Sequence, residues 1–157
     1  LDDEISTEAE YLLSVIKNPA VMKKANEQAL AESPYLYRSN TIHIALLVLP
    51  KNDVDINYLK TLVSDYHAID FENEVFEISA MMMGADQHLL MIKTFTNVKG
   101  VMSYNQRLKS NTAITAELNK SDYKILAISM ENFKEFYKNK DVEGYYNFFK
   151  KNYLDSN

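Results

Sequence analysis

The spacing of hydrophobic residues along the chain changes several times, and the order of these changes is the clearest structural signal in the sequence. Residues 42–49 are apolar at nearly every position, as in a strand buried on both faces. Residues 56–66 carry apolar side chains at helical spacing, directly after Asp55, a residue type favoured as N-cap. Two further strands are predicted by residues 75–83 and 88–95. The first half of the domain therefore predicts a strand, a helix and a hairpin.

The second half of the chain predicts a similar succession. Asn97 is placed to cap a helix that continues to about residue 108, and residues 112–119 form a short irregular or helical link. Residues 123–130 predict a fourth strand. The tail, 131–154, is rich in Phe and Tyr at helical spacing and is interrupted near Lys140-Asp141. The tail is therefore expected to form two helical segments.

Two successive β-α-β units predict an α+β fold, a ferredoxin-like βαββαβ sandwich with an antiparallel sheet. Right-handed connections give the strand order 4-1-3-2 and place both helices on one face. The first and third strands are then central, which agrees with their apolar character. Their second face cannot stay bare, so the C-terminal aromatic helical tail is expected either to cover it or to serve as a docking surface.

The N-terminal part has a different pattern. Residues 5–31 predict two short amphipathic helices, a hairpin that cannot bury both apolar faces alone. We therefore divide the chain into a helical hairpin at 1–32, which could end a helical repeat array, a linker at 33–41 that contains Pro34, and the α+β domain at 42–154.

Composition excludes several classes of function. The chain has no cysteine, which removes disulfides, thiolate metal sites and cysteine nucleophiles. Its net charge is −5 and its only arginines are Arg38 and Arg107, so the basic face of a nucleic-acid-binding protein is not expected. The longest apolar run, 44–49, is far shorter than the roughly 20 residues of a membrane span.

The residues that could carry chemistry form no catalytic or metal-binding pattern. His43 and His88 each begin a strand, and these strands run antiparallel, so the two side chains should lie at opposite ends of the sheet. His67, late in the first helix, could approach the end of the sheet that carries His43, but no cysteine or carboxylate stands at ligand spacing to complete a metal site. Asp53 and Asp55 are better explained as a solvated carboxylate and a helix cap than as a divalent-ion site. We predict no cofactor, no metal and no enzymatic activity.

Two apolar segments are candidates for contact with a protein partner. One is the end of the second strand, an expected sheet edge whose flexible thioethers suit adaptable contacts, and the other is the aromatic tail. The residues selected are Met81, Met82, Met83, Tyr145, Tyr146 and Phe149.

Several strings in the domain also resemble a known family. They are His43 to Pro50 followed by Asp53-Val54-Asp55, Asn119 to Ser129, Asn132-Phe133, Phe136-Tyr137, and Phe148 to Leu154. Together they resemble the C-terminal domain of tetratricopeptide-repeat lipoproteins of the Bacteroidetes envelope, which are associated with type IX secretion and gliding motility. The resemblance covers about residues 42–154.

The resemblance implies a piece of a longer lipoprotein on the periplasmic side of the outer membrane. The membrane would be contacted only through a lipid anchor on the full-length parent, and the partners would be proteins of the cell envelope. The helical hairpin would then end the repeat array. The residues alone do not exclude a cytoplasmic location.

We therefore expect a non-enzymatic protein-interaction module, which could also form a homodimer through an open sheet edge. The alternative is a regulatory domain of the same topology that binds a small ligand near residues 50–55. An enzyme is disfavoured, because no acid and base are paired.

Overall fold

A computed structural model describes residues 33–155. The chain divides into two compact units, Leu1–Leu36 and Tyr37–Asn157, and the fold described below is that of the second. The helical hairpin expected at 1–32 lies outside the described residues. The second unit begins before residue 42, because the Ser39 carbonyl accepts a hydrogen bond from the Val98 amide, at 2.9 Å. Part of the segment interpreted as a linker is thus attached to the domain.

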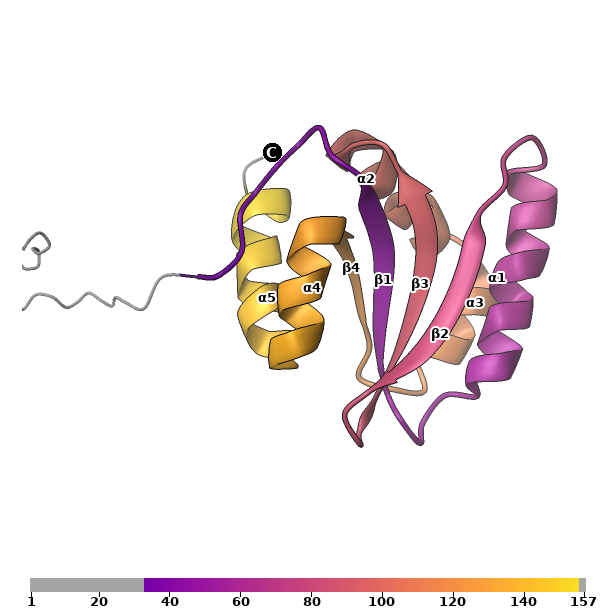
Figure 1. Ribbon diagram of the computed structural model, residues 1–157. Coiled ribbons are helices and arrows are strands. Elements are labelled where there is room, and N and C mark those ends of the chain that lie inside the picture. Colours follow the sequence, from indigo (N-terminus) through magenta and orange to yellow (C-terminus); the bar gives the residue numbers. More distant parts are fainter. Residues whose placement is uncertain (1–32, 156–157) are drawn as a thin grey trace, which may run out of the picture. The chain divides into compact units, whose positions relative to one another are not determined.

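Four strands form one antiparallel sheet (Figure 1), with the order β2-β3-β1-β4. Read from the β4 edge, this order is 4-1-3-2, so each strand has the neighbours expected from the sequence. The strands are β1 (His43–Pro50), β2 (Glu77–Met83), β3 (Gln87–Phe95) and β4 (Lys124–Ser129).

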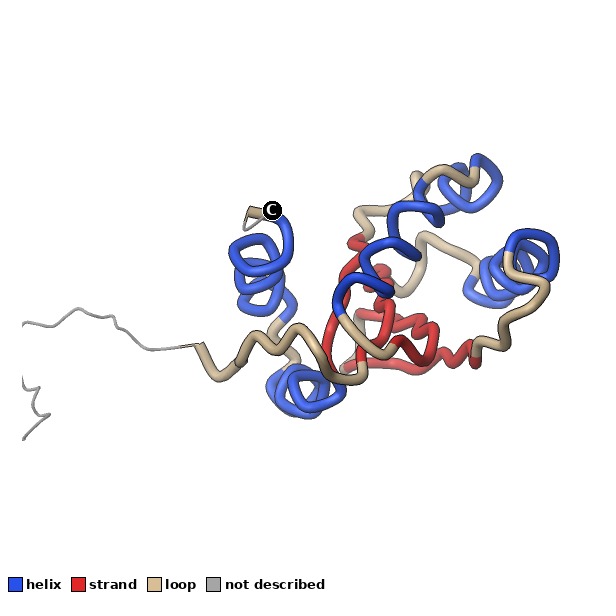
Figure 2. The backbone as a smooth tube through the Cα atoms, turned by 90° about the horizontal axis from the view of Figure 1, so that it is seen from above, coloured by secondary structure: helices blue, strands red, loops and turns tan. Residues whose placement is uncertain are grey.

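The helices lie on both sides of this sheet. Figure 2 shows α1, α2 and α3 on one side and α4 and α5 on the other, close to β4. The elements are α1 (Ile56–Asp70), α2 (Val98–Lys109), α3 (Thr112–Leu118), α4 (Met130–Asn139), α5 (Val142–Phe149) and a final π-helical turn, η2 (Lys150–Leu154). The domain is therefore an α+β fold in three layers.

Local sequence signals set the helix ends. The Asp55 carboxylate accepts hydrogen bonds from the amides of Asn57 and Tyr58 and so caps α1. The Asn97 side chain accepts from the Gly100 amide and caps α2. Lys140 ends α4 in the left-handed conformation, with φ at 53°. The predicted caps at Asp55 and Asn97 and the predicted break near Lys140 are confirmed.

The core fills both faces of the sheet. In β1, every residue from His43 to Leu49 is buried, which confirms the prediction of a strand covered on both sides. Side chains of α1, α2 and α3 cover one face, and aromatic side chains of the tail cover the other. The main contributors from the helices are Leu59, Val63, Val101, Leu108, Ile114, Leu118, Phe136, Tyr145 and Tyr153.

The aromatic tail packs on its own domain. Phe136 and Tyr145 are fully buried, and their rings pack edge to face, with centroids 5.8 Å apart and planes at 67°. The Tyr137 hydroxyl, from α4, donates to the Met82 carbonyl of β2 at 3.3 Å. The tail therefore spans the second face from β4 to β2, which is the first of the two roles expected for it.

Candidate functional site

The two edge strands of the sheet, β4 and β2, differ in how many of their carbonyl groups accept hydrogen bonds from the chain's own side chains. At β4, the Asn105 amide of α2 donates to the Leu126 carbonyl at 3.1 Å, and the Tyr145 hydroxyl of α5 donates to the Ala127 carbonyl at 2.5 Å. These two side chains reach β4 from opposite faces of the sheet. Carbonyl groups of this strand are thus occupied by the chain's own side chains, and helices flank the edge.

The other edge, β2, is open within the described part of the chain. It pairs with β3 and with no other strand. Ala80 is exposed, and Ile78, Met81 and Met82 are half-buried. Edge strands are usually protected by proline, lysine or a bulge, and the β2 sequence EISAMMM pairs with β3 without any of these. An unprotected, largely apolar edge of this kind is suited to pairing with another strand.

On the α1 side, a groove lies at the start of β2, between α1 and Ile78. Its volume is about 400 Å³. Val75, at its rim, is 98% exposed. The groove is also lined by Ser64, Ala68, Phe76 and Ile78. Its lining also includes Glu72 and Glu74, so the groove combines apolar surface with acidic side chains.

Val75 was expected to lie within the second strand, but β2 begins at Glu77. The Glu74 amide donates to the Phe71 carbonyl in a turn that precedes the strand. Phe76 packs instead into an aromatic cluster with His67, Phe95 and Tyr104, whose ring centroids lie 4.9 to 5.4 Å from its own. The packing of half-buried Phe76 against these rings thus shortens the strand and leaves Val75 exposed.

On the α4 side of the same edge, two opposite charges lie near the two ends of β2. Glu77 is exposed at the beginning of the strand, and Lys140 is exposed at the end of α4. The Lys140 chain passes over the β2–β3 turn, because its Cδ lies 3.6 Å from where a Cβ at Gly84 would be. Neither Glu77 nor Lys140 has an ion-pair partner among residues 33–155.

The six residues selected from the sequence fall into two groups. Met81, Met82 and Tyr146 are half-buried, so part of each side chain remains on the surface. Met83 (2% exposed), Tyr145 (0%) and Phe149 (3%) lie inside this chain's own core, which leaves little of them for a partner. Sequence reasoning did not select Glu77, Ile78, Ala80 and Lys140. The absence of proline and lysine from 77–83 could have drawn attention to the first three.

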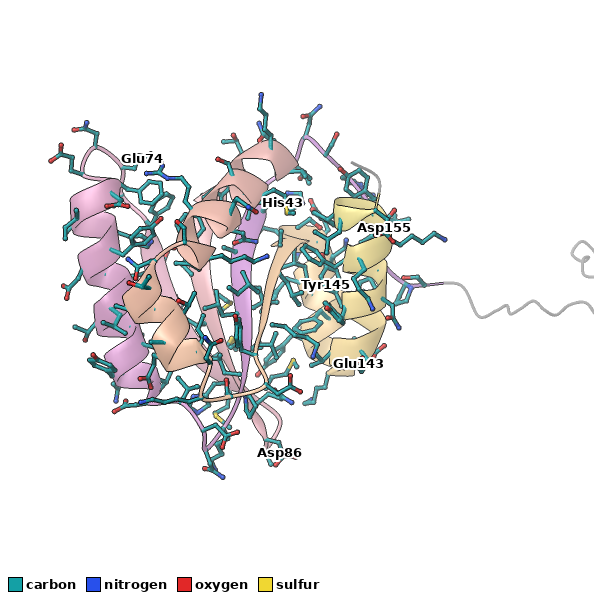
Figure 3. All side chains as sticks on the ribbon, turned by 180° about the vertical axis from the view of Figure 1, so that it is seen from behind. His43, Glu74, Asp86, Glu143, Tyr145 and Asp155 are labelled. Carbon is teal, nitrogen blue, oxygen red and sulfur yellow. The ribbon has the colours of Figure 1, made fainter. Side chains whose placement is uncertain are left out.

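Two of the three histidines, His43 and His67, are hydrogen-bonded to tyrosine hydroxyls within the fold. Figure 3 shows His43 inside the fold, and its Nε2 lies 2.7 Å from the Tyr153 hydroxyl. His67 Nε2 lies 2.6 Å from the Tyr104 hydroxyl. Burial lowers the pKa of both imidazoles, which favours their neutral form. His88 pairs with Leu49 at the far end of β1 from His43, as expected.

Across residues 33–155, no three His, Asp or Glu side chains are grouped so that they could hold a metal ion. Asp55 caps α1, and its amide donates to the buried Glu117 carboxylate at 3.3 Å. The second oxygen of that carboxylate lies 2.9 Å from Lys120 Nζ. The Asp53-Val54-Asp55 segment is thus held by local hydrogen bonds.

A larger cleft lies at the other end of the sheet, between the β2–β3 turn and the start of α5. Its volume is about 550 Å³, and its walls include Asp86, Asp122, Lys124, Lys140 and Glu143. Lys124 Nζ lies 3.7 Å from a Glu143 carboxylate oxygen. The cleft also borders Pro50, where the alternative hypothesis placed a ligand. Its mixed charges suit a small polar molecule rather than an apolar one.

Comparison with known proteins does not assign the chain to a family. No protein-family model, curated protein or solved structure matches it significantly. Among the helices of residues 33–155, none is both long and apolar enough to cross a membrane.

Proposed function

We propose that this domain is a non-enzymatic protein-interaction module of ferredoxin-like βαββαβ type, and that the β2 edge is its docking surface. The observation that carries the proposal is the difference between the two edges. Side chains of α2 and α5 occupy two carbonyls of β4, whereas β2 exposes Ala80 at its centre and accepts one side-chain hydrogen bond, from the Tyr137 hydroxyl to the Met82 carbonyl. A sheet edge left open in this way can add a strand from a partner.

The chemistry of the edge supports this role. In strand addition, backbone hydrogen bonds supply affinity and pockets for alternate side chains supply selectivity. The β2 edge pairs with no strand besides β3 among the described residues, and a groove lined by Ala68, Phe76 and Ile78 lies at its start. Half-buried Met81 and Met82 add flexible apolar surface.

We further propose that the parent protein is an envelope lipoprotein on the periplasmic side of the outer membrane, where it acts as an assembly factor for type IX secretion or gliding. The support is the sequence resemblance of residues 42–154. Its strings coincide with β1, β4 and core aromatics of the tail such as Phe136. These residues maintain the fold, so the resemblance concerns the type of domain and not a reaction.

The interaction role is tested by site-specific photo-crosslinking in cells that produce the parent protein. A photoreactive residue at Ala80 is expected to give discrete protein adducts, because this side chain lies at the open edge. The same residue at Lys109, exposed at the end of α2, is the control. Equal adducts at both positions, or none at Ala80, would contradict the proposal.

The cleft of about 550 Å³ beside Pro50 favours one second candidate, a regulatory domain that binds a small ligand. A ligand that binds the folded state raises the melting temperature. Thermal-shift measurements with amino acids and nucleotides are the test. A shift seen in the wild-type protein and lost in Lys124→Ala would support ligand binding in this cleft, and no shift with either class would count against it.

A further inference from the structure

We propose that the β2 edge pairs with the β2 edge of a second copy of this chain, antiparallel and centred on Ala80, so that the two sheets join. This inference rests on the proposed function, because it names the partner of the same edge. Three features of the edge fit this one register: exposed Ala80 at its centre, the groove beside Ile78, and the charges of Glu77 and Lys140, which have no ion-pair partner among residues 33–155.

The first feature is the small residue at the centre. In a pairing centred on Ala80, the two Ala80 residues face each other and Ile78 faces Met82 of the second copy. The Tyr137 hydroxyl reaches the Met82 carbonyl from outside the β2–β3 pair. This contact is expected if the backbone groups of Met82, and with them those of Ala80 and Ile78, face away from β3, because such groups alternate along a strand.

The second feature is the groove on the α1 side. Residues directly opposite each other in an antiparallel pair have their side chains on the same face. Ile78 lines the groove, so Met82 of the second copy would enter it beside Ile78 and cover Phe76. Of the three α1 residues on this groove, Ser64 and Ala68 are small, and the third, His67, is mostly buried. By symmetry, both grooves of the dimer would be filled in this way.

The third feature is the charge pattern on the α4 side. The same register places Glu77 opposite Met83 of the second copy, next to Gly84. Lys140 lies over Gly84 in each copy. Glu77 of one copy would therefore meet Lys140 of the other, and the symmetric pair would form at the opposite end. Both charges lack an ion-pair partner among the described residues of the single chain.

A second copy accounts for these features better than an unrelated strand does. An unrelated strand needs only the open backbone, whereas the self-complementary register uses the groove and both charges at once. In a two-fold arrangement, each surface must match another part of the same patch. Ile78 with Met82 and Glu77 with Lys140 satisfy this condition.

The test is sedimentation velocity on the full chain from about 1 µM to about 1 mM, a range that detects weak and moderate dimers. We expect a concentration-dependent dimer. Ala80→Pro should raise its dissociation constant at least about 100-fold, because proline removes the central donor and is tolerated at an edge whose N–H faces solvent. Glu77→Lys and Lys140→Glu should each raise it about tenfold, and the double variant should return to within about threefold of wild type.

Asp53→Lys and Lys109→Glu are matched charge controls on exposed residues away from the edge, and they should leave the dissociation constant unchanged. A monomer at every concentration, or a dimer that none of the edge variants weakens, would overturn the self-pairing. A monomer that still gives crosslinked adducts with other proteins at Ala80 would overturn this inference alone and leave the interaction role standing. If Ala80→Pro does not fold, the charge-exchange variants decide the question.

Discussion

The Nε2 atom of His43, at the start of β1, lies 2.7 Å from the hydroxyl of Tyr153, in η2 near the end of the chain. His43 Nδ1 lies 2.8 Å from the Thr41 carbonyl, which can only accept, so Nδ1 carries the proton. Nε2 of the neutral ring is then an acceptor, and the Tyr153 hydroxyl donates to it. This buried hydrogen bond joins the first strand to the last helical turn.

The neutral state of His43 predicts acid sensitivity. Burial lowers its folded-state pKa, and that of His67, below the usual 6.5. The unfolded chain therefore binds more protons as the pH falls through 6.5, and the free energy of unfolding should decrease from pH 7.5 to pH 5. Urea unfolding at both pH values measures this decrease. His43→Gln should make the pH dependence shallower, and an unchanged slope would show that His43 is not its source.

Removal of the Tyr153 hydroxyl should destabilise the fold. Tyr153→Phe leaves buried Nε2 of His43 without its donor, which typically costs about 1–3 kcal/mol. Tyr137→Phe is the control, since its hydroxyl makes a longer bond, 3.3 Å, at a half-buried site. Chemical denaturation of the three proteins gives the comparison, and an equal loss in both variants would contradict the special role of the His43–Tyr153 bond.

Two buried tyrosines should lose their protons only at a higher pH than exposed tyrosines do. Burial raises the pKa of Tyr153 to about 12 and raises that of Tyr104 further. Because unfolded tyrosine loses its proton near pH 10, the free energy of unfolding should fall as the pH rises above 10. A spectrophotometric titration should show some of the eleven tyrosines ionising only when the circular dichroism signal is lost. Ionisation of all of them before unfolding would be inconsistent with this burial.

The Asp55 side chain should act as a helix cap and not as a metal ligand. Asp55→Ala is expected to cost about 0.5–2 kcal/mol, whereas Asp55→Asn retains an oxygen acceptor and should cost less. Asp53→Ala should have little effect, because Asp53 is exposed. Thermal unfolding with and without Mg²⁺ and Ca²⁺ completes the test. A melting temperature raised by either ion, and no longer raised in Asp53→Ala, would favour a metal site instead.

The cover of the second face by α4 should contribute strongly to stability. Phe136 is fully buried between α4 and the sheet, so Phe136→Ala should cost about 3–5 kcal/mol. Phe133, half-buried on the same helix, is the matched control and should cost clearly less. Denaturant unfolding compares the two. Similar losses would mean that the tail packs on the sheet less closely than its burial indicates.

Much of the fold could be predicted because its signals are local. The caps at Asp55 and Asn97, the break near Lys140 and the continuous apolar stretch of β1 depend on neighbouring residues and on spacing. The spacing of apolar residues and the residue types at turns then limit the order of strands and helices along the chain. The short, right-handed connections between them limit how they are arranged in space. The start of β2 was misplaced because the aromatic cluster around Phe76 overrides the apolar alternation before it.

The functional surface depends on contacts between distant segments. The sequence determines that Met83, Tyr145 and Phe149 are apolar, but only packing decides that they lie in the core and that Ala80 does not. Likewise, Lys140 reaches the β2–β3 turn because α4 crosses the second face of the sheet. Hydrophobic burial is non-directional, so a local pattern shows which side chains leave water, while the partner that covers them is selected by the whole fold.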